Sequence, residues 1–310
     1  MELIRMITPA NSIAALLLLV PFLAAAFFPQ WFSRRVRSWP VLVQLLCPAS
    51  LSAPYAMVAS AAQAFHWFWF GLYALLPVAV ATLLWQAGRI DPGNPPQRPG
   101  PVAGSLGQRG NWRDFLVLAA LGLAVDLRWF EGAWPAHLAI FNKMLLLDAG
   151  IYGFIAMRQL EGAGFDLRLR LRDAAIGLRE LAFYTPIALA LGLSLGFLHL
   201  HARWPGLAPI AGAWLFTFFF IAVPEELFFR GWLQNLLEPR MGRYPALLLT
   251  AVLFGLAHFN KRAVLFNWRY VLLAAVAGFF YGRAWRQQRR VGASAITHAS
   301  VDAIWSLWLR

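Results

Sequence analysis

The chain has 310 residues, of which 60% are hydrophobic and only 13% are charged, and its mean hydropathy is +0.58. A soluble globular domain is about half apolar and about a quarter charged, so this composition excludes an ordinary soluble domain and favours a chain embedded in a bilayer. The net charge of +13 comes from arginines that cluster between apolar runs, which is typical of loops in membrane proteins rather than of a nucleic-acid-binding surface.

The apolar runs predict an all-α fold, a polytopic transmembrane helical bundle. The first span is expected at 12–32 as an uncleaved helix rather than a signal peptide, because the positive block Arg34-Arg35-Val36-Arg37 follows it and would hold that end in the cytoplasm. Further spans are expected at about 41–63, 65–87, 115–130, 137–157, 179–199, 209–237, 245–260, 270–285 and 292–309. The apolar run inside 115–130 is too short to cross, so this segment is re-entrant or interfacial in an expected total of eight to ten spans.

Two stretches interrupt the pattern of apolar runs. Residues 88–112 contain five prolines and several glycines, which predict a loop. Residues 165–173 alternate strictly between apolar and charged side chains, as a strand does. A lone strand would have no partner in a helical bundle, so we expect an extended basic segment on the cytoplasmic surface, attracted to anionic lipid. The single cysteine, Cys47, excludes an intrachain disulfide and a zinc-thiolate site.

The chain divides near residue 160 by the distribution of its ionisable residues. Residues 1–160 form an N-terminal transmembrane region whose role the sequence does not indicate, because its polar residues are scattered. Residues 161–310 concentrate ionisable side chains inside apolar segments. Such residues are costly in a membrane and are therefore candidates for function.

Three clusters in successive apolar segments carry the chemistry. They are EELFFR at 225–230, FGLAH at 254–258 and HASVD at 298–302. On a helix, Glu226 and Arg230 are one turn apart and can pair, whereas Glu225 points about 100° away and stays available for another role. His298 and Asp302 share a helical face in the same way. Each cluster alone has a structural explanation, as an ion pair or a buried histidine, but three together predict one shared, hydrated site.

These motifs resemble those of the CPBP family, the type II CAAX prenyl proteases and bacteriocin-processing proteins, in which EExxxR, FxxxH and HxxxN or HxxxD occupy successive helices. The resemblance covers about 130 residues and leaves out the first 160. It implies that Glu225 activates water with His258 as its partner, that His298 and Asp302 stabilise the oxyanion, and that Glu226 and Arg230 support the site. Many members have asparagine at the last position, and an aspartate donates a hydrogen bond only when it is protonated. Asp302 therefore either is held neutral by an apolar site, orients His298 or ligates a metal.

The leading hypothesis is an intramembrane endopeptidase that needs no cofactor and cleaves a peptide, lipidated or not, near the cytoplasmic face. We expect the protein in the plasma membrane, with Glu225 near mid-bilayer in a cavity open to the cytoplasm. A metal-dependent protease is the first alternative, because Glu225, His258, His298 and Asp302 are all competent zinc ligands, although the HExxH signature is missing. The second alternative is a non-catalytic scaffold or immunity protein that uses the polar cluster for binding. The expected partners are a peptide or protein substrate and the lipid bilayer, with no nucleic acid.

Overall fold

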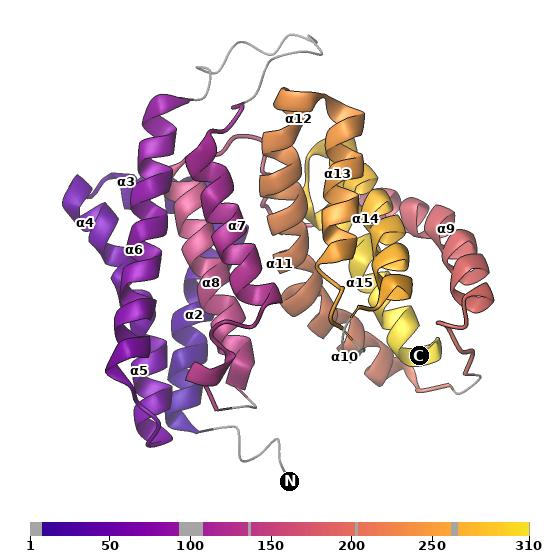
Figure 1. Ribbon diagram of the computed structural model, residues 1–310, viewed down its shortest axis with the longest axis horizontal. Helices are drawn as coiled ribbons and strands as arrows, with labels where there is room; N and C mark the ends of the chain where they lie inside the picture. The colour runs from indigo at the N-terminus through magenta and orange to yellow at the C-terminus, as the bar shows by residue number, and fades with distance from the viewer. Residues whose placement is uncertain (1–7, 93–107, 136–137, 202–203, 262–265, 310) are drawn as a thin grey trace. The chain divides into compact units, whose positions relative to one another are not determined.

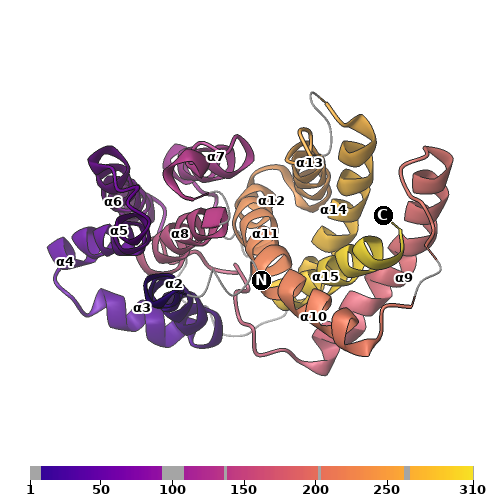
Figure 2. The same cartoon turned by 90° about the horizontal axis from the view of Figure 1, so that it is seen from below.

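The computed structural model of the protein describes residues 8–92, 108–135, 138–201, 204–261 and 266–309. Throughout these ranges the chain is helical or irregular and forms no strand, which confirms the predicted all-α class (Figures 1 and 2). Contacts between Cα atoms divide the chain into two compact units. Unit 1 comprises Met1–Pro101 and Gly110–Leu160, and unit 2 comprises Val102–Arg109 and Glu161–Arg310.

Unit 1 is a bundle of helices, and one buried arginine links the ends of two of them. The side chain of Arg158, just after the last helical segment, donates from Nε to Asp114 (2.8 Å) and from Nη2 to Asp91 (2.6 Å). These contacts join the start of α7 to the end of α6. The helices are α2 (Pro9–Phe27), α3 (Pro29–Arg37), α4 (Val41–Leu46), α5 (Ser52–Ala61), α6 (Trp67–Ile90), α7 (Trp112–Asp126) and α8 (Ala139–Ile151), with short 3₁₀ segments at Cys47–Leu51 and Glu131–Ala133 and a π-helical segment, η4 (Tyr152–Met157).

Unit 2 carries all three sequence clusters on neighbouring helices. Helix α14 packs against α13, α9 and α15, and α15 also packs against α9 and α11. Gly242, with a φ of 87°, separates α12 from α13 in a backbone conformation that favours glycine. The helices are α9 (Leu171–Ser194), α10 (Leu207–Thr217), α11 (Val223–Glu226), α12 (Asn235–Met241), α13 (Arg243–Leu256), α14 (Trp268–Gln288) and α15 (Val291–Trp308), with π-helical segments η5 (Phe218–Ala222) and η6 (Leu227–Gln234).

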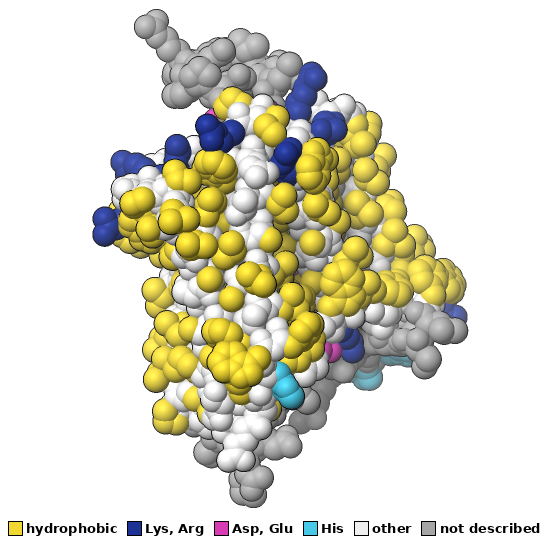
Figure 3. Space-filling view, turned by 60° about the vertical axis from the view of Figure 1, so that its left-hand side comes forward, with side chains coloured by type: hydrophobic (Ala, Val, Ile, Leu, Met, Phe, Trp, Pro, Cys, Tyr) yellow, Lys and Arg dark blue, Asp and Glu magenta, His cyan; other side chains and the backbone are white. Residues whose placement is uncertain are grey.

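Within the described ranges, six helices are long and apolar enough to cross a membrane, so the chain is a multi-pass integral membrane protein. They are Pro9–Phe27, Val41–Ala61, Trp67–Ile90, Ile140–Met157, Leu171–Ser194 and Leu207–Met241. Hydrophobic side chains cover much of the face shown in Figure 3, with few charged groups among them. The predicted spans at 245–260, 270–285 and 292–309 correspond to α13, α14 and α15, which are too short or too polar to be counted with the six. The total of eight to ten spans therefore stays a prediction.

The flanking helices extend a short way into the loop predicted at 88–112. Helix α6 continues to Ile90 and α7 begins at Trp112, where Asn111 caps the helix by accepting from the backbone N–H of Arg113 (3.0 Å). Residues 93–107 lie outside the described ranges. The predicted span at 179–199 also begins earlier, at Leu171, because Asp173 caps α9 by accepting from the backbone N–H of Arg170 (2.9 Å).

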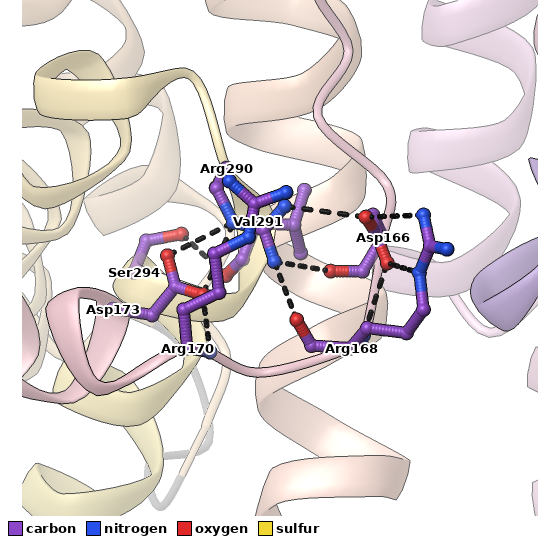
Figure 4. A network of polar contacts seen from close by, with 7 residues as sticks. All are labelled: Asp166, Arg168, Arg170, Asp173, Arg290, Val291 and Ser294. Carbon is purple, nitrogen blue, oxygen red and sulfur yellow. Dashed lines mark hydrogen bonds and ion pairs between the residues drawn. The ribbon is translucent and has the colours of Figure 1, made fainter.

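The alternating segment at 165–173 is irregular as far as Arg170, and helix α9 begins at Leu171. The irregular part belongs to a connection at residues 161–170, here called the strap, that runs beside the turn between α14 and α15 (Figure 4). The side chain of Arg290 in that turn donates to Asp173 (2.9 Å) and to the carbonyl oxygen of Arg168 (2.8 Å), and it lies 3.3 Å from a carboxylate oxygen of Asp166. Phe165 and Leu167 are buried. The first part of the alternation thus reflects packing inside unit 2, whereas Leu169 and Leu171 are exposed, as in the surface segment that the sequence predicted.

Candidate active site

Glu225 and Glu226 lie in the middle of a long helical run that leaves regular α-geometry on both sides. The four residues of α11 stand between the π-helical segments η5 and η6. Each π-helical segment rotates the following residues relative to a regular α-helix, and such segments are frequent at functional sites. The two glutamates therefore face directions that a simple helical wheel over 207–241 does not give.

Glu226 is completely buried and has two partners. It accepts a hydrogen bond from Nε of Arg230 (3.1 Å), as the spacing of four residues predicts, and it lies 2.9 Å from Nδ1 of His298. The Arg230 guanidinium is also buried, 5.2 Å from the ring centroid of Phe254. Gly278 permits this approach, since a Cβ atom there would stand 3.3 Å from Nη2 of Arg230. Glu226 thus links the first and third sequence clusters.

His298 is surrounded by carboxylates and held flat against an aromatic ring. Its Nε2 atom lies 3.5 Å from Asp302 and 3.9 Å from Glu225, while Nδ1 faces Glu226. The Tyr281 ring stacks on the imidazole with a centroid separation of 4.5 Å and an interplanar angle of 15°. Both ring nitrogens therefore face acceptors, which are satisfied together when both nitrogens carry protons.

His258 lies just beyond the end of α13, and its surroundings define its protonation pattern. Its Nδ1 atom is 2.8 Å from the carbonyl oxygen of Phe254. A carbonyl only accepts, so Nδ1 carries the proton and the lone pair of the neutral imidazole is on Nε2. The ring also contacts that of Tyr270, at a centroid separation of 5.0 Å. Glu225 and His298 are both near enough to His258 to interact with it electrostatically.

A cavity of about 90 Å³ adjoins this cluster. His258, His298 and Asp302 line it together with mostly apolar side chains of α9, α14 and α15. Glu225 does not line the cavity. Its side chain is 28% exposed, and its carboxylate lies beside His298, which does line the cavity. An acidic group that retains contact with solvent therefore lies next to a cavity lined mostly by apolar side chains.

The structure brings together all six residues that the sequence singled out. Glu225, Glu226, His298 and Asp302 are linked by the distances given above, Arg230 joins through Glu226, and His258 shares the cavity with His298. In the described part of the chain, no group of three or more His, Cys, Asp or Glu side chains is arranged to hold a metal ion. The cluster combines a partly exposed carboxylate, an imidazole with an available Nε2 and a buried ion pair, a set that can activate water.

Sequence reasoning missed three tyrosines of the site. Tyr184 from α9 and Tyr270 and Tyr281 from α14 all line the cavity. Tyrosine is common at membrane interfaces, and fifteen per cent of this chain is aromatic, so neither residue type nor spacing distinguishes these three from the others. The arrangement of α9 and α14 around α15 was needed to find them.

Comparison with known proteins agrees with these motifs. Residues 207–304 match the family model described as type II CAAX prenyl endopeptidase Rce1-like. This segment begins at the first residue of α10 and contains all six predicted site residues, but it excludes α9. The chain matches no curated protein and no solved structure. The family whose model matches residues 207–304, the Rce1-like type II CAAX prenyl endopeptidases, is therefore the one that the sequence motifs predicted.

Proposed function

We propose that this protein is an intramembrane endopeptidase in which Glu225 and His258 activate a water molecule. The observation that carries the proposal is the position of Glu225. It is a partly exposed carboxylate 3.9 Å from Nε2 of buried His298, inside a segment that matches an endopeptidase family. Membership of that family implies a protein substrate; a peptide with or without a lipid at its C-terminus is the class we propose.

The reaction follows from the roles that each group can fill. Glu225 takes a proton from water while Nε2 of His258 accepts a hydrogen bond from it, and the resulting hydroxide attacks the scissile carbonyl carbon. The carbon–nitrogen bond then breaks as the proton held by Glu225 passes to the leaving amine. Glu226 and Arg230 hold His298 in place from the side opposite Asp302. His298 bears a positive charge when both its nitrogens are protonated, which stabilises the oxyanion electrostatically.

Peptide cleavage by the purified full-length protein in detergent tests the proposal. The substrates are matched peptides with and without a C-terminal lipid, and the variants are Glu225→Gln and His258→Ala. We expect each variant to lower kcat by at least about 100-fold, because each removes a group that takes part in proton transfer. Glu131→Gln is the matched control, since Glu131 is a partly exposed partner of Arg128 outside the site and its variant should cleave normally.

Two outcomes would overturn the proposal. If the folded wild-type protein cleaves none of the peptides while Glu225→Ala still performs the cellular role, the polar cluster serves a non-catalytic scaffold or immunity function. If cleavage is abolished by a strong chelator and restored by zinc, Glu225, His258, His298 and Asp302 act as metal ligands instead. Cleavage that persists under chelation and disappears in both site variants supports the proposed mechanism.

A further inference from the structure

Tyr184 reaches the active-site cavity from a helix that lies outside the family segment. It is in the middle of α9, is 7% exposed and lines the cavity with His258, His298 and Asp302. Asp302 and Tyr270 are the groups near enough to interact with it electrostatically. No hydrogen bond engages the Tyr184 hydroxyl among the described residues. A buried hydroxyl that faces a cavity without a protein partner is available to a bound molecule.

Helix α9 is fixed firmly against α15, so the position of Tyr184 is defined. The hydroxyl of Thr297 donates to the carbonyl oxygen of Gly177 (3.1 Å), and a Cβ atom at Gly177 would lie 2.8 Å from the side chain of Ile296. Buried Glu180 pairs with Arg283 of α14 at 3.2 Å. These contacts lie one to two turns before Tyr184 on the same helix, and the Tyr184 ring packs against Phe280. Preorganisation of this kind is what a catalytic hydrogen-bond donor requires.

The motif residues that line the cavity offer few free hydrogen-bond donors to it. Both nitrogens of His298 face carboxylates, and Nδ1 of His258 donates to Phe254. Asp302 as a carboxylate is an acceptor only. An oxyanion formed in the cavity therefore needs a donor from the other lining residues, among which Tyr184, Tyr270 and Tyr281 carry hydroxyls, and a tyrosine hydroxyl fills that role in other enzymes.

We propose that Tyr184 is a further catalytic residue, whose hydroxyl donates a hydrogen bond to the oxyanion of the tetrahedral intermediate. The inference rests on the proposed endopeptidase function. As the hydroxide bonds to the carbonyl carbon, the electron pair of the C=O π bond moves to the oxygen, and the Tyr184 O–H donates to that oxygen without giving up its proton. When the carbon–nitrogen bond breaks, the carbonyl re-forms and the hydrogen bond weakens. Tyr184 thus acts on the transition state more than on the bound substrate.

A double-mutant cycle between Tyr184 and Asp302 tests this assignment. Tyr184→Phe should lower kcat by about 100-fold with little change in KM, the loss that removal of one oxyanion donor produces. Asp302→Asn introduces an amide donor at the cavity. In an Asp302→Asn background, Tyr184→Phe should therefore cost less than about 10-fold, because the amide replaces the lost hydroxyl. Tyr244→Phe is the matched control, since the Tyr244 side chain is largely exposed and lines no part of the cavity.

Each outcome has a distinct meaning. An unchanged kcat for Tyr184→Phe in a cleaving enzyme overturns the assignment and leaves the proposed function intact. A loss of the same size in both backgrounds, or a loss accompanied by a lower unfolding temperature, overturns the assignment and gives the Tyr184 hydroxyl a structural role instead. If the wild-type protein cleaves no peptide, the proposed function fails. The assignment of Tyr184 is then tested by the binding of a non-cleavable peptide with a tetrahedral phosphinate centre. Wild type and Tyr184→Phe binding that phosphinate equally tightly would overturn the assignment independently.

Discussion

The charges around His298 explain why the Glu226–Arg230 pair is as important as Glu225 and His258, the groups proposed to activate water. Glu225, Glu226 and Asp302 all lie within 3.9 Å of the imidazole, and Arg230 is the arginine that offsets them from within the cluster. Carboxylates crowded in this way repel one another unless cations or shared protons compensate. Arg230 contacts Glu226 alone among the three, so its removal leaves the most deeply buried carboxylate with less compensation.

Replacing Arg230 by methionine should strongly destabilise the folded protein. The Met side chain fills similar space but removes the cation, which leaves Glu226 buried and charged with only His298 as a partner. Breaking one half of a buried ion pair typically costs about 3–5 kcal/mol. Thermal or denaturant unfolding in detergent, followed by tryptophan fluorescence, measures this change.

The double variant Glu226→Gln/Arg230→Met is the matched control for that prediction. Removing both charges abolishes the uncompensated carboxylate, so the double variant should recover about half of the lost stability. Recovery of stability without recovery of cleavage is expected, because Glu226 also orients His298. A double variant that is no more stable than Arg230→Met would contradict this account of the pair.

At the scale of single residues, the sequence could predict contacts along one helix but not those between helices. The Glu226–Arg230 pair follows from a spacing of four residues and is present. The Glu226–His298 contact joins residues 72 positions apart, and it depends on how α11 packs on α15. The π-helical geometry on both sides of Glu225 was likewise unpredictable, since one extra residue per turn leaves no mark in residue type.

Among the elements, the strap has the clearest role, because it fixes the start of the helix that carries His298. Gly164 lies against the α14–α15 turn, where a Cβ atom would come within 2.0 Å of the carbonyl oxygen of Arg289, and its own carbonyl accepts from the backbone N–H of Val291 (2.9 Å). Arg290 adds the side-chain bonds to Asp166 and Asp173 drawn in Figure 4. His298 follows two turns later, so displacement of the strap would move it.

The pKa of Asp166 predicts how this connection responds to acid. Partial burial raises the pKa, but hydrogen bonds from Arg168 and Arg290 outweigh burial and lower it to about 2, from an ordinary value of 3.8. A carboxylate whose pKa is lowered by folding stabilises the fold above its unfolded pKa. This contribution should be complete above about pH 5 and should disappear as the pH falls from about 4 to about 2.

Asp166→Asn should therefore be less stable than the wild type at pH 7 and nearly as stable at pH 2. The difference between the two unfolding midpoints, measured across this pH range in detergent, checks the prediction. Glu131→Gln serves as the control, because Glu131 forms only an exposed pair at 3.8 Å and such pairs contribute little. A difference between Asp166→Asn and wild type that stays constant down to pH 2 would contradict the role assigned to the Asp166 carboxylate.

The alternating pattern predicted the surroundings of the strap only in part, whereas a capping pattern marks the start of α9. Alternation over 165–173 correctly indicated a non-helical backbone as far as Arg170, but not which apolar side chains are buried. Asp173 three residues after Arg170 marks the start of α9, since an acidic side chain in the first turn can accept from free backbone N–H groups. The backbone beside buried Phe165 and Leu167 bonds to the α14–α15 turn, about 120 residues further along the chain.

At the scale of the whole molecule, composition alone predicted a helical membrane protein. The positions of the cavity-lining residues along their helices follow only from the structure. The ion pairs of Glu180, Glu238 and Asp173 with Arg283, Arg289 and Arg290 mark one end of unit 2, here called the arginine-rich end. The cavity-lining residues of α9, α13, α14 and α15 come from the parts of these helices farther from that end, as far as Leu309. The sequence alone predicted a cavity open to the cytoplasm; these positions lead us to expect access from the other end.

Orientation follows from the distribution of basic residues in unit 2. The connections at the arginine-rich end and their flanking turns carry eight arginines: Arg168, Arg170, Arg172, Arg240, Arg243, Arg286, Arg289 and Arg290. The connections at the opposite end, 195–206 and 257–267, carry Arg203, Lys261 and Arg262, with Arg269 one turn further on. Loops richer in lysine and arginine remain in the cytoplasm. We therefore expect the arginine-rich end to be cytoplasmic and the cavity to be reached from the opposite, non-cytoplasmic half of the bilayer.

Cysteine labelling in cells tests this expectation, because Cys47→Ser yields a chain with no other thiol. Single cysteines replace Tyr244 beside the arginine-rich end, Leu200 near the opposite end and Thr185 in the cavity wall. A membrane-impermeant maleimide reacts only with a thiolate that water reaches, so added outside intact cells it should label Leu200→Cys and Thr185→Cys but not Tyr244→Cys. Labelling of Tyr244→Cys from outside would reverse the orientation. If Tyr244→Cys and Thr185→Cys react only after the cytoplasmic face is exposed, the cavity opens to the cytoplasm, and substrates must then approach from the side that the sequence alone predicted.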